Sequence, residues 1–504
     1  MLGKYIYFCG KFFPGSGILE LIGGKRVKTK EKTKARIRIP KQPKELVKLL
    51  EELFSAGVNA DAVIRPVKTR SGQSLTLIYL NGMADAKLVN EFILKPLMEH
   101  AEPERDLAAF SERCVEIAEA STVYDMSEAV AAVTGGMTAL FLKGESACLI
   151  LETRGFEKRE VSKPENESIV LGPKESFTES LRTNITLIRR RIDSASLIAE
   201  NMSIGGGKGA SAAILYKRGA ADPELIDEVR GRLERIGSDM LISSGVLEQL
   251  IEDGGFFPIP RVLSTERPDR AASHIISGGA CVLLDGSPFA LLMPISFFDL
   301  MESPEDIYLR PAPGTLIRVV RYVGAFISTF MPGYFLALVL YHQGMLTTEV
   351  LSTVAASREM VFEPIALEMI LLLLIFQLIR EAGLRVPGPV GQAIGIIGGL
   401  IMGQAAVTAH LASPVVLIIV AASGLGNFCI PDYSTQLSAS YIRLAMVISA
   451  WLGGLLGITA ATLITVASLA GMNSFSRPFL TPFAPKRRTR RPLIIRGRIE
   501  GGGA

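Results

Sequence analysis

The glycine-rich stretch at residues 205–208, with the sequence GGGK, is the feature whose residue types could bind a phosphate group. A phosphate-binding loop also needs a glycine five residues before its last glycine and a serine or threonine directly after the lysine. Met202 and Gly209 occupy those two positions instead. We therefore interpret the stretch as a surface loop and predict no nucleotide site there.

The histidines and cysteines are too scattered in the sequence to indicate a metal site or a disulfide framework. No grouping of serine, histidine and aspartate, and no close pair of carboxylates, stands out by its spacing. We therefore expect no enzyme activity, no cofactor and no metal. The residues concerned are His100, His274, His342, His410, Cys9, Cys114, Cys148, Cys281 and Cys429.

A ladder of glycines at a strict spacing of four residues runs through one apolar stretch and comprises Gly391, Gly395, Gly399 and Gly403. On a helix, this spacing leaves one face almost free of side chains, so another backbone can approach closely. Tight helix packing is the simpler interpretation. The alternative is a helix that lines a water-filled path in an oligomer. The side chains that suggest this alternative are Gln392, Gln404, Thr408 and His410, with Ile397 and Ile401 as neighbours of the ladder.

Five apolar stretches predict a membrane domain, and they are residues 316–341, 364–380, 388–412, 414–430 and 444–470. A spanning helix needs about 20 apolar residues, so the first, third and fifth stretches are long enough alone. If both ends of the domain are cytoplasmic, the number of crossings is even. Five stretches is an odd number, so one of them should lie in the membrane interface or re-enter from the same side. We expect this of the stretch 364–380, and the alternative is that it applies to the pair of stretches at 388–430. Glu368 is then either an intramembrane charge or a residue that faces the headgroups.

Charge is concentrated in the C-terminal tail. The net charge is +4, and from Arg477 onward eight Lys or Arg residues oppose the single acid Glu500. A short basic segment beside an apolar one typically marks the cytoplasmic side of a membrane, and Arg318 and Arg321 at the start of the first apolar stretch agree. We therefore expect a cytoplasmic N-terminal half and tail, and no nucleic-acid partner.

The N-terminal half alternates short helix and strand patterns, which predicts a soluble α+β or α/β fold of two subdomains followed by an α-helical transmembrane domain. The hairpin expected at 280–294, turned by Asp285-Gly286, resembles the helix and hairpin pattern of residues 127–155. Asp222 and Pro223 mark the start of a helix. The predicted ranges are a poorly ordered basic lead-in at 1–40, subdomains at 41–170 and 171–312, a helical membrane domain of four or five segments at 313–475, and a basic tail at 476–504.

Residues 172–192 are predicted to form a polar, strongly charged helix. At a spacing of three, Glu179 and Arg182 can pair on one helix face. The simpler interpretation is a solvated face or a subunit contact, and the alternative is a role in ligand binding or gating.

Several short motifs together resemble the A subunits of the GerA-type spore germination receptors, over roughly residues 45–485. The most specific is GPKESFTESLRTNITLIRRRI at 172–192, within which we single out Glu175, Phe177, Glu179, Arg182, Asn184, Arg189, Arg190 and Arg191. The others are TERPD (265–269), DGSPFAL (285–291), SPEDIY (303–308), ASRE (356–359), REAGLRVP (380–387), GQA (391–393 and 403–405) and IPDYS (430–434).

This resemblance implies a germinant receptor subunit in the inner membrane of a bacterial spore. It also implies partners, namely a transporter-like B subunit and a lipoprotein C subunit, and assembly of several copies into a nutrient-gated ion channel. The family includes paralogues associated with dipicolinate release. The competing hypotheses are a scaffold that relays a signal without conducting, and a component of a secondary transporter, although no inverted repeat is visible in residues 315–470.

Overall fold

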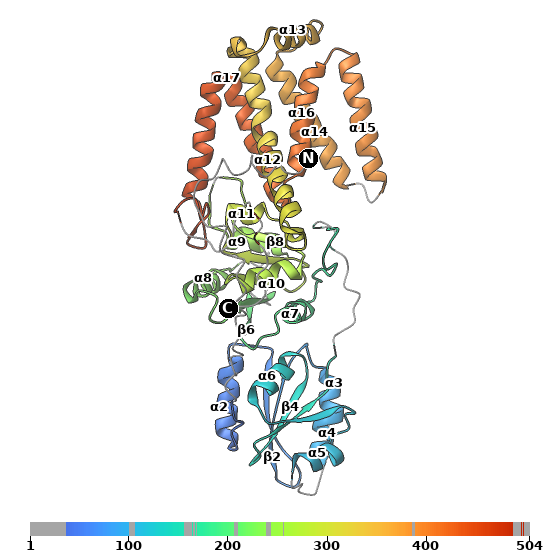
Figure 1. Cartoon of the computed structure of the whole chain (residues 1–504), viewed down its shortest axis with the longest axis vertical. Coiled ribbons are helices and arrows are strands. Elements are labelled where there is room, and N and C mark those ends of the chain that lie inside the picture. Colours follow the sequence, from blue (N-terminus) through green and yellow to red (C-terminus); the bar gives the residue numbers. More distant parts are fainter. Residues whose placement is uncertain are drawn as a thin grey trace, which may run out of the picture.

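The computed structural model describes residues 37–99, 106–155, 169–205, 210–237, 243–255, 257–385 and 389–486, with isolated positions at 164, 167, 495 and 497; the side chains of residues 384–398 are not described. Three layers follow one another along the long axis of the molecule (Figure 1). Soluble unit 1 (residues 37–155) lies at one end, soluble unit 2 (residues 169–310) lies in the middle, and a helical domain lies at the other end. The predicted basic lead-in falls almost wholly outside the described residues.

Soluble unit 1 is a five-stranded antiparallel sheet in the order β1-β2-β4-β5-β3. Its strands are β1 Ala62–Lys68, β2 Ser74–Leu80, β3 Ala120–Val123, β4 Thr138–Leu142 and β5 Cys148–Leu151. Its helices are α2 Pro43–Phe54, α3 Ala86–Leu88, the π-helix η1 Val89–Leu94, α4 Lys95–Glu99, α5 Leu107–Arg113 and α6 Met126–Thr134.

Side chains alternate between the two faces of each strand, and both faces of the strands β2, β4 and β5 are buried. Leu77 and Leu140 point to the face covered by η1, α4 and α5. Ile78 and Phe141 point to the opposite face, which α2 and α6 cover. The near-continuous apolar strands of this unit therefore follow from helices on both sides of the sheet.

Soluble unit 2 repeats the same strand order, β6-β7-β9-β10-β8, again with antiparallel pairs throughout. Its strands are β6 Leu197–Ile204, β7 Ala210–Lys217, β8 Leu263–Thr265, β9 Ala280–Leu284 and β10 Ala290–Met293. Its helices are α7 Leu181–Arg189, α8 Pro223–Glu234, α9 Ser244–Ile251, α10 Pro268–Ile276, α11 Phe297–Leu300 and the 3-10 helix η2 Pro304–Ile307.

The expected fold class is confirmed, and the antiparallel pairing makes both units α+β. The order helix, hairpin, helices, edge strand, helix, hairpin occurs in each unit. The similarity expected between residues 127–155 and the hairpin at 280–294 therefore holds for the topology of the two whole units. The predicted turn at Asp285-Gly286 joins β9 to β10, and Asp222 is the N-cap of α8, where its carboxylate accepts a hydrogen bond from Glu224 N.

The predicted helix at 172–192 is correct only in its second half. The helix α7 begins at Leu181, and Ser180 is its N-cap, with its hydroxyl accepting from Thr183 N. Residues 174–179 have no helical hydrogen bonds, so Glu179 does not share a helix face with Arg182. The helix is also not a solvated face, because most of its side chains are buried, the apolar ones in the core of unit 2.

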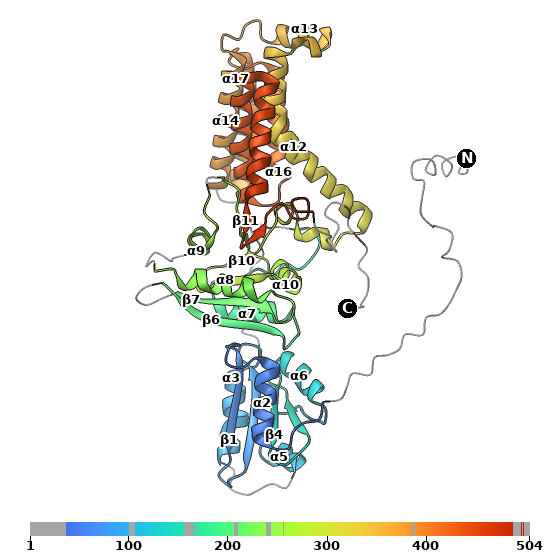
Figure 2. The same cartoon turned by 90° about the vertical axis from the view of Figure 1, so that its left-hand side faces the viewer.

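The helical domain lies directly next to soluble unit 2 along the long axis of the molecule (Figure 2). Its elements are α12 Pro311–Tyr341, the 3-10 helix η3 Gln343–Met345, α13 Thr348–Ser357, α14 Ile365–Arg385, α15 Pro389–Thr408, α16 Pro414–Phe428 and α17 Tyr433–Gly471. The helices α12 and α17 are each long and apolar enough to cross a membrane. Helix α13 lies at the end farthest from the soluble units (Figure 1).

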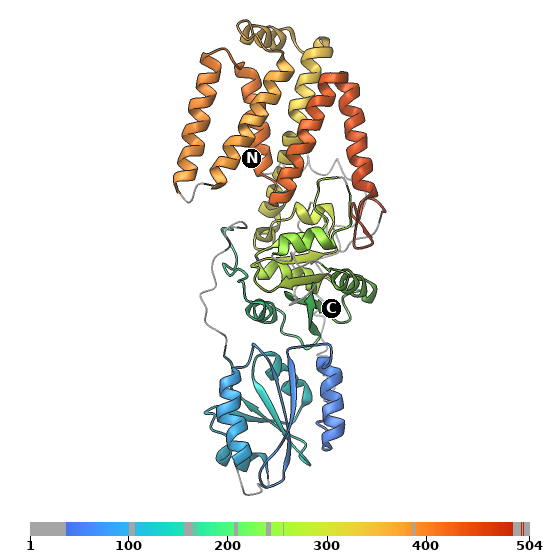
Figure 3. The same ribbon diagram turned by 180° about the vertical axis from the view of Figure 1, so that it is seen from behind.

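Helix α17 consists of two segments that run side by side and in opposite directions (Figure 3). Gly454 separates them, with φ 56° and ψ −137°, a backbone conformation outside the helical region. Ile442 in the first segment and Leu469 in the second pack against the same core cluster of soluble unit 2, as a hairpin requires.

This hairpin changes the count of segments. The fifth apolar stretch was expected to form one segment, and it contributes parts of two. Among the described residues, the long segments are therefore α12, α14, α15, α16 and the two halves of α17. The stretch 364–380, expected to stand apart, forms α14, which packs beside α15 and α16. With six segments, an even count no longer requires one stretch to be set aside.

The chain after α17 returns to soluble unit 2, so the first residues of the predicted basic tail (476–504) pack on that unit. Met472 and Phe479 are buried in the core of that unit, and Arg477 pairs with Asp222 at 3.2 Å. The strands β11 Asn473–Ser474 and β12 Arg477–Pro478 form the turn that carries these contacts. Soluble unit 2 thus holds both ends of the helical domain.

Candidate functional site

Helix α15, which carries the glycine ladder, lies at one edge of the helical domain, and α17 lies at the other edge (Figures 1 and 3). Its main neighbour is α14. Around its described half, the exposed residues form one arc, which consists of Leu400, Ile401, Met402, Gln404, Ala405 and Thr408. Ile401 lies near the middle of this arc and is 61% exposed.

The two described glycines of the ladder lie on the other side of the helix. At 3.6 residues per turn, Gly399 and Gly403 lie roughly opposite Ile401. Gly403 faces α16, where a methyl group in its place would lie 3.6 Å from Leu417 Cδ2, an ordinary contact. At Gly399 the same methyl group would meet nothing within 4 Å. Neither glycine is therefore required by a close backbone approach within this chain.

Of the residues singled out on this helix, the structure describes the surroundings of Gly399, Ile401, Gly403 and Gln404. The expectations for Gly391, Gln392, Gly395 and Ile397 fall on side chains outside the described residues. Ile401 and Gln404 share the exposed arc, which carries both apolar and polar groups.

Close approach through glycine does occur elsewhere in the domain. A Cβ at Gly426 in α16 would lie 2.4 Å from the carbonyl oxygen of Gly324 in α12. A Cβ at Gly333 in α12 would lie 3.0 Å from the carbonyl oxygen of Met446 in α17. These glycines allow α12 to pack at the centre of the domain, and the spacing-of-four pattern did not identify them.

Glu368 is fully buried in α14 and does not face the headgroups or solvent. One of its oxygens, Oε1, accepts hydrogen bonds from Ser413 N at 2.6 Å and Ser413 Oγ at 2.7 Å. The other, Oε2, lies 3.3 Å from Nε of Arg358. Ser413 is the N-cap of α16, so the carboxylate also lies at the positive end of that helix. Glu368 therefore connects the loop before α14 to the loop before α16.

A second buried polar cluster was not predicted. Arg443 of α17 is 2% exposed and donates to Ser423 Oγ of α16 at 2.9 Å. Arg380 of α14 donates to the amide oxygen of Asn427 at 2.7 Å, in the amide orientation that also lets Asn427 donate to Gln436 O at 3.2 Å. The hydrogen-bond partners found for these two arginines are thus hydroxyl and amide groups, and the guanidinium of Arg380 also lies over the ring of Tyr433, 5.4 Å from its centroid. An arginine at the end of an apolar stretch was the available signal, since ionisable groups within membrane helices are commonly functional.

The segment before and within α7 joins the two soluble units. Arg189 forms a buried ion pair with Asp61 of unit 1, and its Nη2 also donates to Asn59 Oδ1 at 3.0 Å. Arg182 donates to Asn81 Oδ1 at 2.7 Å. A cleft of about 350 Å³ lies beside these contacts, lined by Asp85, Lys87 and Arg182 among others.

The other residues singled out in this segment stabilise its conformation through contacts within the segment and with unit 2. Arg190 and Arg191 both pair with Glu175, at 3.3 and 2.8 Å. Asn184 accepts from Thr178 N at 2.8 Å and so orders the turn before the helix. Phe177 is buried in the core of unit 2, whereas the part of Glu179 that is engaged is its carbonyl, which accepts from Gly286 N at 2.7 Å.

Two further motifs, SPEDIY and TERPD, contact each other near the junction between the soluble units and the helical domain, where Tyr308 donates to Asp269 at 2.8 Å. Asp306 of SPEDIY is 1% exposed and accepts from Arg318 and Arg321 of α12, at 3.1 and 2.9 Å. Arg267 of TERPD is fully buried and donates to Pro173 O at 2.9 Å. The two arginines predicted to mark a membrane surface therefore also anchor α12 to soluble unit 2.

Comparisons with known proteins agree with the motifs. Spore germination protein A1 of Bacillus subtilis is 37% identical over 424 residues, which cover 84% of this chain and 87% of that protein. Spore germination protein KA of the same organism is 33% identical over 441 residues, covering 87% and 81%. The crystal structure of the N-terminal domain of the A subunit of the Bacillus megaterium spore germinant receptor GerK3 aligns at 27% identity and a TM-score of 0.42, over 52% of this chain and 99% of that one.

The family model described as Bacillus/Clostridium GerA spore germination protein matches residues 48–501, nearly the whole chain. This match extends through the two soluble units, the helical domain and the returning C-terminal segment. The resemblance inferred from the motifs is confirmed. The chain belongs to the GerA family of spore germination proteins.

Proposed function

We propose that this chain is the membrane subunit of a spore germinant receptor, and that several copies assemble around an axis into a nutrient-gated ion channel in the inner spore membrane. Opening of the channel would release ions and begin germination. Membership of the germination family supports the cellular role. The conducting role rests on the helical domain.

The exposed arc of α15 is the observation that carries the channel. A helix at the edge of the domain presents apolar and polar side chains together, in Ile401, Gln404 and Thr408, on a face that no other described helix covers. A gate needs an apolar constriction, and a conducting wall needs polar groups near it. In a ring of copies, the arcs of successive α15 helices would supply both.

The alternation of the helical segments supports a common side for the soluble units and both ends of the helical domain. Helix α12 starts at soluble unit 2, and the second half of α17 ends there. Arg318, Arg321 and the basic tail lie on that side. Because basic residues are enriched on the cytoplasmic side of membrane proteins, this favours a cytoplasmic location for the soluble units. The germinant would then act through the partner subunits, a transporter-like B subunit and a lipoprotein C subunit.

Monovalent cation flux tests the channel. We would reconstitute the receptor in vesicles and compare Ile401→Asn with Ile418→Asn, because Ile418 on α16 is 65% exposed and is a matched apolar site on a different helix. Constitutive leakage in Ile401→Asn alone supports a gate at the α15 arc. If both variants assemble and neither leaks cations, while germination signalling is altered, the chain relays the signal without conducting. Equal leakage in both variants would point to general disruption and contradict the proposed gate.

A further inference from the structure

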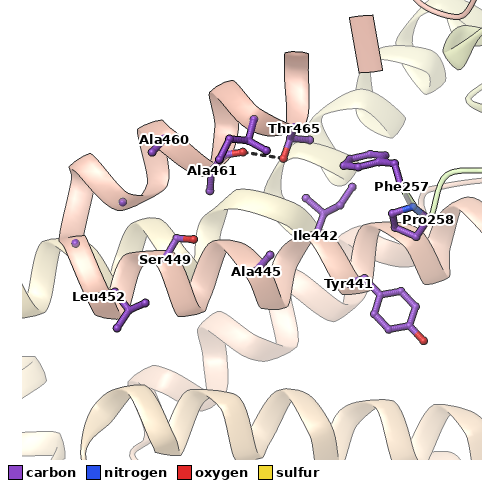
Figure 4. Close-up of a pocket in the computed structure, with 13 residues that line it drawn as sticks. Phe257, Pro258, Tyr441, Ile442, Ala445, Ser449, Leu452, Ala460, Ala461 and Thr465 are labelled. Carbon is purple, nitrogen blue, oxygen red and sulfur yellow. Dashed lines mark hydrogen bonds between the residues drawn. The ribbon is translucent and has the colours of Figure 1, made fainter. Parts of the chain in front are cut away.

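Two cavities meet where soluble unit 2 touches the α17 hairpin. The larger, of about 730 Å³, lies between the two segments of α17 and the Phe257-Pro258 turn (Figure 4). The smaller, of about 370 Å³, is lined by the same turn and by residues of α9. Both volumes fall in the range of small-molecule sites. Neither cavity has a place in the channel proposed above.

The larger cavity is an apolar groove with a small-residue floor. Ala445 and Ser449 of the first α17 segment face Gly457 and Ala461 of the second. Its rim consists of exposed apolar side chains, with Tyr441, Leu452 and Ile464 at 66%, 76% and 66% exposure. From Tyr441 to Leu452 the groove follows the helix for roughly 17 Å. It is therefore long, narrow and open to the outside of the helical domain.

The smaller cavity is polar and carries more negative than positive charge. Glu248, Glu252 and Asp253 line it together with Arg261. Glu252 accepts from Arg261 N at 2.5 Å and Asp253 pairs with Arg232 at 2.6 Å, whereas Glu248 has no ion-pair partner among the described residues. Burial, Glu252 and Asp432 raise the pKa of Glu248 to about 7. A cation placed beside Glu248 would relieve this unfavourable environment.

The turn between the cavities is tied to α17, so their relative position is fixed. Ser438 donates to Pro258 O, and Ser434, one helical turn earlier, lines the polar cavity. Phe257 and Pro258 line both cavities. An occupant with a charged end and an apolar chain could therefore span the turn, with the charge at Glu248 and the chain along α17.

We propose that the two cavities bind one membrane lipid with a primary-amine headgroup, its ammonium at Glu248 and Glu252, its phosphate toward Arg261, and one acyl chain in the α17 groove. The proposal rests on the proposed function in one respect, the placement of the helical domain in a bilayer. Charge complementarity selects this lipid, because the carboxylates would repel an anionic headgroup that has no amine. Tyr441 lines the end of the groove nearest the Phe257-Pro258 turn, and tyrosines commonly mark the membrane surface.

Lipid retention by the full-length protein tests the proposal. We would solubilise the protein from vesicles with equal amounts of phosphatidylethanolamine and phosphatidylglycerol of identical acyl chains, and measure retained lipid by native mass spectrometry. We expect retained phosphatidylethanolamine to exceed phosphatidylglycerol by about tenfold, as a charge-assisted hydrogen bond to Glu248 predicts. Equal retention of the two lipids, or retention of neither, would overturn the proposal.

Three variants distinguish binding of the lipid headgroup from binding of the acyl chain. Glu248→Gln should remove most of the headgroup preference and leave acyl retention in place. Ala445→Trp should fill the groove and abolish retention, while Ile448→Trp, on the same helix but outside the groove, should not. If a helix from a second copy fills the groove, the wild type retains no lipid and Ala445→Trp instead lowers the mass of the assembly. Since no ion flux is measured, failure here leaves the channel proposal standing.

Discussion

Arg189 and Asp61 form a bidentate ion pair that joins the two soluble units, with Nε 2.5 Å from Oδ2 and Nη2 2.7 Å from Oδ1. The side chains are 2% and 9% exposed, so water screens the pair poorly. Arg189 belongs to α7 of unit 2, whereas Asp61 begins the first hairpin of unit 1. The orientation of unit 1 thus depends on a charged contact that is buried in the middle of the soluble half.

Removing one partner of this pair should be costly. Arg189→Met leaves Asp61 buried without a countercharge, and we expect a loss of about 3–5 kcal/mol in the free energy of unfolding. Arg189→Lys should recover only part of this loss, because an ammonium cannot make two parallel hydrogen bonds. Thermal unfolding of the full chain in detergent measures both. The double variant Arg189→Met, Asp61→Asn should be more stable than Arg189→Met alone, and the opposite order would contradict this account.

Glu368→Gln should destabilise the helical domain by about 2–4 kcal/mol, because it leaves Arg358 without a countercharge and removes the negative charge at the start of α16. Glu349→Gln, at an exposed position in α13, is the matched control and should change stability by less than about 0.5 kcal/mol. Melting temperatures of the two variants in detergent test this. Similar melting temperatures would show that the buried carboxylate contributes little.

Gly454→Ala should disrupt the α17 hairpin. The backbone there has φ 56° and ψ −137°, and an added Cβ would lie 2.9 Å from Cδ2 of Tyr341. We expect a loss of about 2–4 kcal/mol from strain and overlap together. Gly453→Ala is the control, because a Cβ there meets nothing within 4 Å. Limited proteolysis and melting temperature should distinguish the two, and equal behaviour would contradict a sharp reversal at Gly454.

The stability of the protein should fall as the pH rises from about 4.5 to 7 through the contribution of Glu248. Its pKa is raised from 4.5 to about 7 in the folded protein by burial and by Glu252 and Asp432. The folded state therefore binds more protons than the unfolded state in this window, and stability is lost as the group ionises. The loss is complete about one pH unit above this pKa, where Glu248 is ionised in the folded protein as well.

Glu248→Gln should remove this dependence and raise the melting temperature at pH 8 but not at pH 4.5. Glu224→Gln, at an exposed site on α8, should leave the pH profile as it is in the wild type. A wild-type profile that does not change on Glu248→Gln would assign the pH dependence to other groups.

The order of elements in the soluble half could be read from local signals. The turn at Asp285-Gly286 and the cap at Asp222 depend on residues close in sequence, and both are found where they were predicted. The start of α7 could not be read in this way. Residues 174–179 have helical composition, but Asn184 and the buried Phe177 hold them in a turn against unit 2.

The sequence by itself determined the family, the α+β class of the soluble units and the apolar character of the helical domain, because motifs and hydrophobic patterns are local properties of the chain. Only the tertiary structure decided that α17 folds back at Gly454, that α15 turns Ile401 outward and Gly403 toward α16, and that Glu368 meets Ser413 rather than headgroups. Each of these depends on which surfaces other helices cover. Contacts between residues far apart in sequence, set by packing, do not appear in spacing or composition.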